Sequence, residues 1–204
     1  MYIPPQFSPK APQSAGQLMR EFPFASLITS DGQGLPFVTH LPLHWEEGEQ
    51  RLYGHCAKSN PHWKYLVARS QSVVTFLGPH AYMSPQVYPD LVRVPTWNYL
   101  AVHVTVTAKL IQDSAPKELW LKALIADHEP GYAAQWKDLP EDYTQKMLQA
   151  IVGFELQAVE VQCKLKLNQH RPESHQAMYK AYAQSEDSSA RDLARWMERL
   201  GMVS

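Results

Sequence analysis

The amino-acid sequence predicts a mainly β protein with added helices (α+β), built around an antiparallel barrel. Three observations indicate this class. Alternating strand patterns are joined by turns of hairpin length, and most helical patterns come late in the chain. In addition, 16 prolines and 9 glycines divide the 204 residues into short segments. A chain of this length can bury a hydrophobic core without disulfide bonds or metal ions.

The first elements alternate between helix and strand. Ser14 begins a short helical pattern that Pro23 ends. An Asp-Gly turn then predicts a hairpin, and Pro42 predicts an edge or a bulge in its second strand. Asn60 is a typical N-cap residue, so a helix is expected at residues 61–69. Strands are expected at residues 24–30, 35–45, 51–57 and 72–77.

The second half begins with a Pro-rich loop, expected at residues 78–96. The clearest strand pattern follows at residues 102–111, where apolar and polar residues alternate. A second long strand at residues 155–167 changes its apolar phase between Ala158 and Val159, as a β-bulge would. Helices are expected at residues 117–127, 141–150 and 173–182, and over a final amphipathic stretch that contains Leu193, Trp196, Met197 and Leu200.

Charge and cysteine content narrow the classes of function. Lys and Arg total 19 against 20 Asp and Glu, so the net charge is -1. This balance argues against an autonomous DNA-binding domain, because such domains usually carry a basic excess. Cys56 and Cys163 allow at most one disulfide bond. The N-terminus has no secretory leader pattern, and no stretch approaches the roughly 20 apolar residues of a membrane span. We therefore expect a cytoplasmic protein with no membrane contact.

The segment GHCAKSNPHW at residues 54–63 carries the strongest candidate site. A strand ends there, Lys58 follows, and Asn60 caps the next helix. Backbone N–H groups at a helix N-terminus favour an anion, and Lys58 adds a positive charge. The alternative is a capped helix beside a solvated lysine that binds nothing. The chain has no Gly-rich nucleotide-binding loop.

Three further segments hold candidate residues. Trp97 and Asn98 could stack on and hydrogen-bond a planar ligand, although aromatic side chains more often simply bury apolar area. His40 follows Thr39 on a predicted strand, but no histidine spacing matches a metal motif, and no metal is expected. Lys164 lies on a strand face that is either solvated or part of an anion site. No pattern identifies a catalytic residue.

Taken together, these segments resemble the PaiB family of FMN-binding proteins, which are named as negative transcriptional regulators. The resemblance runs from Met1 to about Pro172. Its motifs are, in order, MYIP (1–4), HLP (40–42), GHCAKSNPHW (54–63), GPHAYMSP (78–85), VPTWNY (94–99), IVGFE (151–155) and KLKL (164–167).

The resemblance implies a split β-barrel of the FMN-binding, pyridoxamine-oxidase-like kind, with FMN as cofactor. It also implies a homodimer with flavin at the subunit interface. In that fold the lysine-bearing turn after a barrel strand meets the FMN phosphate, which points to Lys58. The remaining cofactor-binding residues that it implies are Asn60, His55, Thr39, His40, Trp97, Asn98 and Lys164.

The resemblance leaves the activity open. We expect residues 1–172 to form the FMN-binding domain and residues 173–204 a C-terminal helical extension. The main interpretation is a flavin-dependent oxidoreductase, similar to a flavin reductase, with a small molecule or a nicotinamide as possible electron donor. The alternatives are a transcriptional regulator of the PaiB type or a non-enzymatic flavin-binding module. Three residues depart from the family pattern: Cys163, Asn168 and His170.

Overall fold

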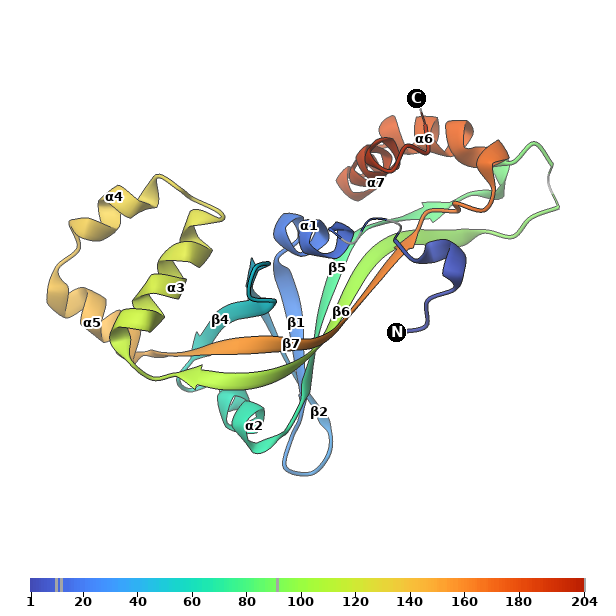
Figure 1. Ribbon diagram of the computed structural model, residues 1–204. Coiled ribbons are helices and arrows are strands. Elements are labelled where there is room, and N and C mark those ends of the chain that lie inside the picture. The colour runs from blue at the N-terminus through green and yellow to red at the C-terminus, as the bar shows by residue number, and fades with distance from the viewer. Residues whose placement is uncertain (10, 12, 91, 204) are drawn as a thin grey trace. The chain divides into compact units, whose positions relative to one another are not determined.

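A computed structural model describes residues 1–9, 11, 13–90 and 92–203 of the chain. Within these residues, seven strands form an antiparallel sheet in the order β2-β1-β5-β6-β7-β4-β3, and seven α-helices accompany it (Figure 1). The strands are β1 Phe24–Ser30, β2 Pro36–Pro42, β3 His44–Glu46, β4 Arg51–Ala57, β5 Ser72–Met83, β6 Thr96–Ile111 and β7 Ile151–Lys166.

The helices fall before, between and after the strands. They are α1 Ser14–Glu21, α2 His62–Ala68, α3 Ser114–Ala126, α4 Tyr132–Lys137, α5 Glu141–Gln149, α6 His175–Ala183 and α7 Ser188–Arg199. Figure 1 shows α3, α4 and α5 as a group inserted between β6 and β7, whereas α6 and α7 follow β7. The expectation of a mainly β fold with helices added late is therefore confirmed.

The sheet closes on itself through β2 and β3, which stand at the two ends of the strand order. A single residue, Leu43, separates them in the chain. A Cβ atom on Gly54 of β4 would lie 2.4 Å from the Leu43 side chain and 3.5 Å from that of Leu41. This contact brings β4 against the end of β2, which gives the barrel that the sequence predicts.

The chain divides into two compact units, and the long strands β5, β6 and β7 contribute to both. The first unit comprises Met1–Leu18, Leu77–Val102 and Gln162–Ser204. Its buried core includes Leu18, Met83, Leu100, Leu165, Met178, Leu193, Trp196 and Met197. The second unit comprises Met19–Phe76 and His103–Val161. Its buried core includes Leu27, Leu52, Val74, Phe76, Val104, Val106, Phe154 and Leu156.

The expected loop at residues 78–96 begins too early, because strand β5 continues to Met83. Strand β6 begins at Thr96, six residues before the strand expected at residues 102–111. Gly78 lies inside β5 because only hydrogen fits there. A Cβ atom would come within 2.7 Å of the Leu18 side chain and 3.2 Å of the Leu100 carbonyl oxygen. Leu91, in the same expected loop, lies outside the described residues.

The phase change in the last strand is present. Phe154 and Leu156 are buried in the first part of β7, and Cys163 and Leu165 are buried in the last part. The buried positions thus change from even to odd along one strand. Val159 is 55% exposed, so the new buried phase begins later than the predicted step between Ala158 and Val159.

Candidate functional site

The turn between β4 and α2 is held by a hydrogen-bonded cluster in the second unit. The Asn60 carboxamide oxygen accepts from the His62 backbone N–H at 3.0 Å, and its Nδ2 donates to the Thr39 hydroxyl at 3.1 Å. The Asn60 side chain thus binds the first backbone N–H of α2, but α2 begins at His62 and its N-cap position is Pro61, one residue later than predicted. Asn60 and Thr39, both predicted site residues, are brought together here.

His62 extends this cluster into the barrel interior. Its Nδ1 lies 2.7 Å from the Thr39 hydroxyl, and its Nε2 lies 2.9 Å from the Thr29 hydroxyl. The Thr29 hydroxyl is in turn 2.7 Å from that of Ser72. One arrangement of protons satisfies every contact: Asn60 donates to Thr39, Thr39 to Nδ1 of His62, and Nε2–H to Thr29. His62 is 1% exposed, and burial lowers its pKa to about 4, so the ring is neutral at pH 7.

Lys58 lies on the exposed rim of the same turn, and its main chain is fixed on both sides. Its backbone N–H donates to the Ala150 carbonyl at 2.8 Å, and its carbonyl accepts from the Trp63 indole at 3.1 Å. The ammonium group is exposed to solvent. Its charge also reaches α3, because burial and the charge of Lys58 together lower the pKa of Lys117. Two cations therefore raise the potential on this side of the barrel.

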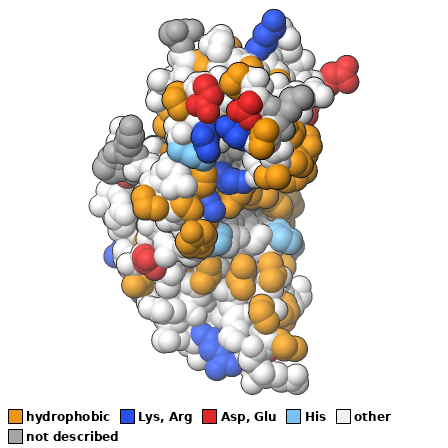
Figure 2. Space-filling view, turned by 90° about the vertical axis from the view of Figure 1, so that its right-hand side faces the viewer, with side chains coloured by type: hydrophobic (Ala, Val, Ile, Leu, Met, Phe, Trp, Pro, Cys, Tyr) orange, Lys and Arg blue, Asp and Glu red, His pale blue; other side chains and the backbone are white. Residues whose placement is uncertain are grey.

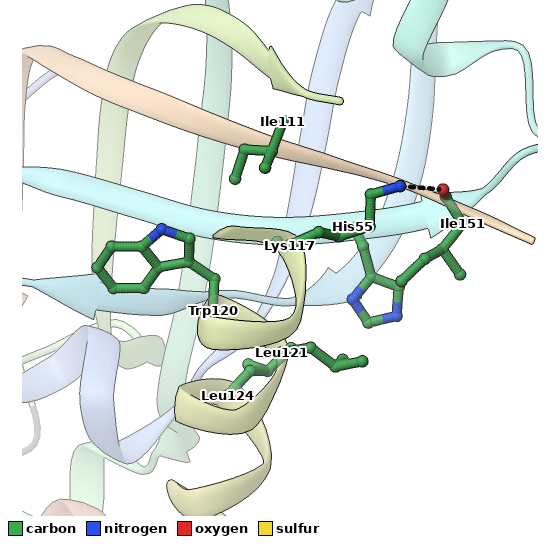
Figure 3. A pocket seen from close by; sticks show the side chains of 8 residues that line it. His55, Ile111, Lys117, Trp120, Leu121, Leu124 and Ile151 are labelled. Carbon is green, nitrogen blue, oxygen red and sulfur yellow. Dashed lines mark hydrogen bonds between the residues drawn. The ribbon is translucent and has the colours of Figure 1, made fainter. Parts of the chain in front are cut away.

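His55 lies on β4 and faces the inserted helices. It lines a small cavity of about 10 Å³ together with Lys117 and Trp120 (Figure 3). Figure 3 shows the Lys117 side chain reaching the Ile151 carbonyl, to which its Nζ donates at 3.3 Å. His55 also lines a larger cavity of about 330 Å³ beneath α3, α4 and α5. Burial lowers the pKa of the His55 imidazole.

His40 points away from this cluster. Successive side chains of a strand face opposite sides of the sheet, so Thr39 and His40 cannot both face Asn60. The His40 ring instead lies 2.9 Å from the Ser26 hydroxyl and stacks on Phe24 at 6.5 Å between ring centres.

The remaining predicted residues, Trp97, Asn98 and Lys164, belong to the first unit. Trp97 is 55% exposed and packs edge to face against Tyr82. Asn98 is buried, and its Nδ2 lies 3.0 Å from the Tyr182 hydroxyl. The Asn98 Oδ1 is buried with no hydrogen-bond partner among the described residues.

Lys164 is not on a solvated face, which corrects one of the two interpretations of this strand. It is 8% exposed, and its Nζ donates to the Tyr2 carbonyl at 3.2 Å. The ammonium lies 5.1 Å from the centre of the Tyr99 ring and 6.0 Å from that of Phe7. These distances are in the range of cation–π contacts. Neighbouring Lys166 donates to the Thr96 hydroxyl and the Trp97 carbonyl, both at 2.6 Å.

Two residues of this region, His62 and Lys117, were not predicted from the sequence. His62 stands in the predicted helix, and only the fold reveals that its ring joins two strands. Lys117 reaches the region from α3, far along the chain, and no local pattern predicts that approach. In the described part of the chain, no group of three His, Cys, Asp or Glu side chains is placed to hold a metal ion. No described helix is long and apolar enough to cross a membrane.

Comparison with solved structures places this architecture among the split barrels of flavin-binding proteins. The chain superposes on the flavocytochrome Anf3 of Azotobacter vinelandii with a TM-score of 0.61 and 23% identity, covering 78% of this chain and 69% of that one. It superposes on the FAD and heme binding protein of Mycobacterium smegmatis with a TM-score of 0.62 and 19% identity, covering 78% and 72%. These likenesses define the fold class.

The chain belongs to the family described as "Putative FMN-binding domain", whose model matches residues 1–160. It is also 32% identical over 202 residues to the protease synthase and sporulation protein PAI 2 of Bacillus subtilis, with 97% of each chain covered. The predicted PaiB-like family, split-barrel fold and FMN cofactor are confirmed.

Proposed function

We propose that this chain is a homodimeric, cytoplasmic flavoprotein that holds FMN with its phosphate at Lys58 and works as a flavin-dependent oxidoreductase similar to a flavin reductase. FMN supplies the electron or hydride transfer when it is bound. The observation that carries the proposal is the β4–α2 turn, a fixed loop that presents an exposed cation in a chain of the FMN-binding family.

The residues at this turn fit a phosphate. Lys58 offers three ammonium donors, and the adjacent Ser59 is exposed and carries a hydroxyl donor. Because the turn is already tied to Thr39, Ala150 and Trp63, little conformational entropy is lost when an anion binds. The second cation, Lys117, adds to the favourable potential.

The other proposed contacts extend from this turn. Thr39, Asn60 and His55 belong to the same unit as Lys58, and His40 faces the opposite side of strand β2. We keep Trp97, Asn98 and Lys164 as contributors to the flavin pocket at the subunit interface of the homodimer. For Asn98, the buried and unsatisfied Oδ1 is an acceptor that a ligand N–H can use.

The proposed dimer is supported by apolar side chains on the surface of the first unit. Figure 2 shows hydrophobic side chains exposed beside Lys and Arg on the face that it views. Large exposed apolar residues of this unit include Tyr82 at 51%, Val94 at 79% and Trp97 at 55%. Of these, Tyr82 and Trp97 pack against each other, and exposed apolar side chains that lie together are typical of interaction surfaces.

The second candidate is a transcriptional regulator, which is favoured by the sporulation protein name of the Bacillus subtilis relative. The charges of this chain argue against strong DNA binding by the protein alone. The net charge is -1, and Lys164 is buried against aromatic rings rather than free to meet phosphate. Lys166 is likewise tied to Thr96 and Trp97.

Two further assignments belong to the proposal. Residues 1–172 form the FMN-binding domain, and residues 173–204, which contain α6 and α7, form a helical extension. A reducing, cytoplasmic location is supported by the two cysteines, which are both buried and unpaired.

One preparation of the purified protein tests the choice of function. We expect visible flavin absorbance after loading with FMN, oxidation of a nicotinamide donor by the loaded protein, and no mobility shift of DNA at low salt. DNA binding below micromolar concentration that weakens steeply with salt, without donor oxidation, would overturn the oxidoreductase and establish the regulator.

A further inference from the structure

The lining of the cavity of about 330 Å³ beneath α3, α4 and α5 does not include Lys58, although it does include the proposed flavin contact His55. It is formed within the second unit, between strand β4 and the helices inserted between β6 and β7. Its volume is at the lower end of the range for pockets that bind small molecules. A cavity of this size fits one molecule of two or three fused rings.

Flat aromatic side chains form much of its wall. Tyr132, Trp136 and Tyr143 all line the cavity, and aliphatic side chains complete it. Trp136 is held in place, since its indole N–H donates to the Glu118 carboxylate at 2.9 Å and Tyr132 packs edge to face against it. Fixed aromatic faces favour a planar partner, because stacking costs them little side-chain entropy.

The charge of the lining favours a cation. Glu129 is the one ionic side chain among the residues that line this cavity, and it is exposed to solvent. Burial lowers the pKa of His55, which favours its neutral form. Lys122 lies over the Trp136 ring at 5.6 Å and is paired with Glu118 at 2.6 Å; it lines a neighbouring cavity that Glu129 and Trp136 also line.

We infer that this cavity binds a planar aromatic amine, with its rings against Trp136 and its ammonium group near Glu129. A cation with an aromatic body satisfies both features, since a protonated amine can pair with the carboxylate and interact with aromatic ring faces. The inference does not depend on the flavin assignment. FMN itself is a poor occupant, because its phosphate would add negative charge beside Glu129.

Calorimetric titration with two indoles of opposite charge tests the inference. Tryptamine carries an ammonium on the indole ring system, and indole-3-acetate carries a carboxylate. We expect tryptamine to bind the full chain at least about tenfold more tightly than indole-3-acetate, the size of one charge-assisted hydrogen bond. The same titrations are run with and without saturating FMN, and the tryptamine affinity is expected to be unchanged.

Three variants locate the binding. Glu129→Gln removes the charge and is expected to abolish the preference for tryptamine, whereas Glu141→Gln, an exposed carboxylate on α5 outside the lining, leaves it intact. Trp136→Leu weakens both indoles, and Trp136→Phe restores part of the affinity. Should Trp136→Leu fail to fold, Met147→Trp provides the second test, because a large side chain at this half-exposed lining position fills the cavity and blocks binding.

Three results would overturn the inference. One is equal affinity for the two indoles, and another is tryptamine binding that survives in Met147→Trp. The third is competition between FMN and tryptamine, which would make the cavity part of the flavin site rather than a separate one. Loss of FMN binding with tryptamine binding intact would contradict only the proposed function.

Discussion

His62 is the residue on which the geometry of the β4–α2 turn depends. Its ring joins Thr39 and Thr29, and through Thr39 it fixes the carboxamide of Asn60. A buried polar network of this kind stabilises one geometry only while every member is satisfied. The turn that presents Lys58 is therefore preorganised by a side chain that touches no solvent.

Burial of this neutral histidine makes stability depend on pH. The pKa of His62 is lowered to about 4 in the folded protein, against 6.5 in the unfolded chain. The unfolded chain binds the proton more readily than the folded protein does. The contribution of neutral His62 to the free energy of unfolding is therefore complete above pH 6.5 and is lost as the pH drops toward 4. The expected loss is about 2–3 kcal/mol between pH 7 and about pH 4.5.

Denaturant unfolding of wild type and His62→Gln at both pH values measures this effect. Gln keeps two polar ends but does not titrate, so the stability gap between the two proteins is expected to shrink at the lower pH. A gap that stays constant across this pH range would show that His62 does not carry the linkage.

The residues of the candidate site were predictable only where the signal was local. Lys58 and Asn60 stand just before the helix that the Asn-Pro pair predicts, so their position beside a helix start was predictable. Thr39 and His40 were both predicted to bind the cofactor, but strand alternation places their side chains on opposite faces of β2. His62 was missed because its partners come from other strands, and only the fold brings them together.

Among the elements, strand β4 shows how tightly the barrel is packed. Gly54 pairs with Phe154 of β7, and an added Cβ would lie 3.2 Å from the Phe154 ring and 2.4 Å from the Leu43 side chain. No conventional side chain fits this position without a shift of its neighbours. The absence of a side chain at Gly54 thus allows Leu43, at the end of β2, to pack against β4. This contact closes the barrel.

Replacement of Gly54 by alanine tests this closure. We expect Gly54→Ala to destabilise the protein by about 1–3 kcal/mol, the usual cost of overpacking a core. Gly32→Ala is the matched control, because an added Cβ there meets nothing within 4 Å. Thermal unfolding of both variants compares the two sites. Equal melting temperatures would contradict the close packing of β4.

The strands with clear alternation or clear turns were predictable from the sequence. β1 and β4 have the expected bounds. The extension of β5 was missed because Gly78 and Pro79 are typical of loops, whereas the fold uses the glycine for close packing against Leu18 and Leu100. The helix α4 was missed because its six residues carry no distinct periodic pattern.

At the scale of the whole molecule, the sequence supports the proposed dimer only through its resemblance to the PaiB family. The exposed side chains of Tyr82, Val94 and Trp97 leave apolar area that a second copy can cover. We expect sedimentation at micromolar concentration to give about twice 23.3 kDa. A 23.3 kDa monomer that still binds FMN would contradict the dimer with its shared flavin site.

The β4–α2 turn is proposed to hold the FMN phosphate through Lys58. Titration of wild type, Lys58→Ala and the control Lys109→Ala with FMN and with riboflavin tests this contact, because riboflavin lacks only the phosphate. Loss of a charge-assisted contact of about 1.5–3 kcal/mol predicts at least about a tenfold weaker FMN affinity in Lys58→Ala, with riboflavin binding unchanged. Lys109, exposed on β6, removes the same charge elsewhere and is expected to leave both affinities as in wild type. An FMN affinity that is unchanged in Lys58→Ala would rule out Lys58 as the phosphate-binding residue.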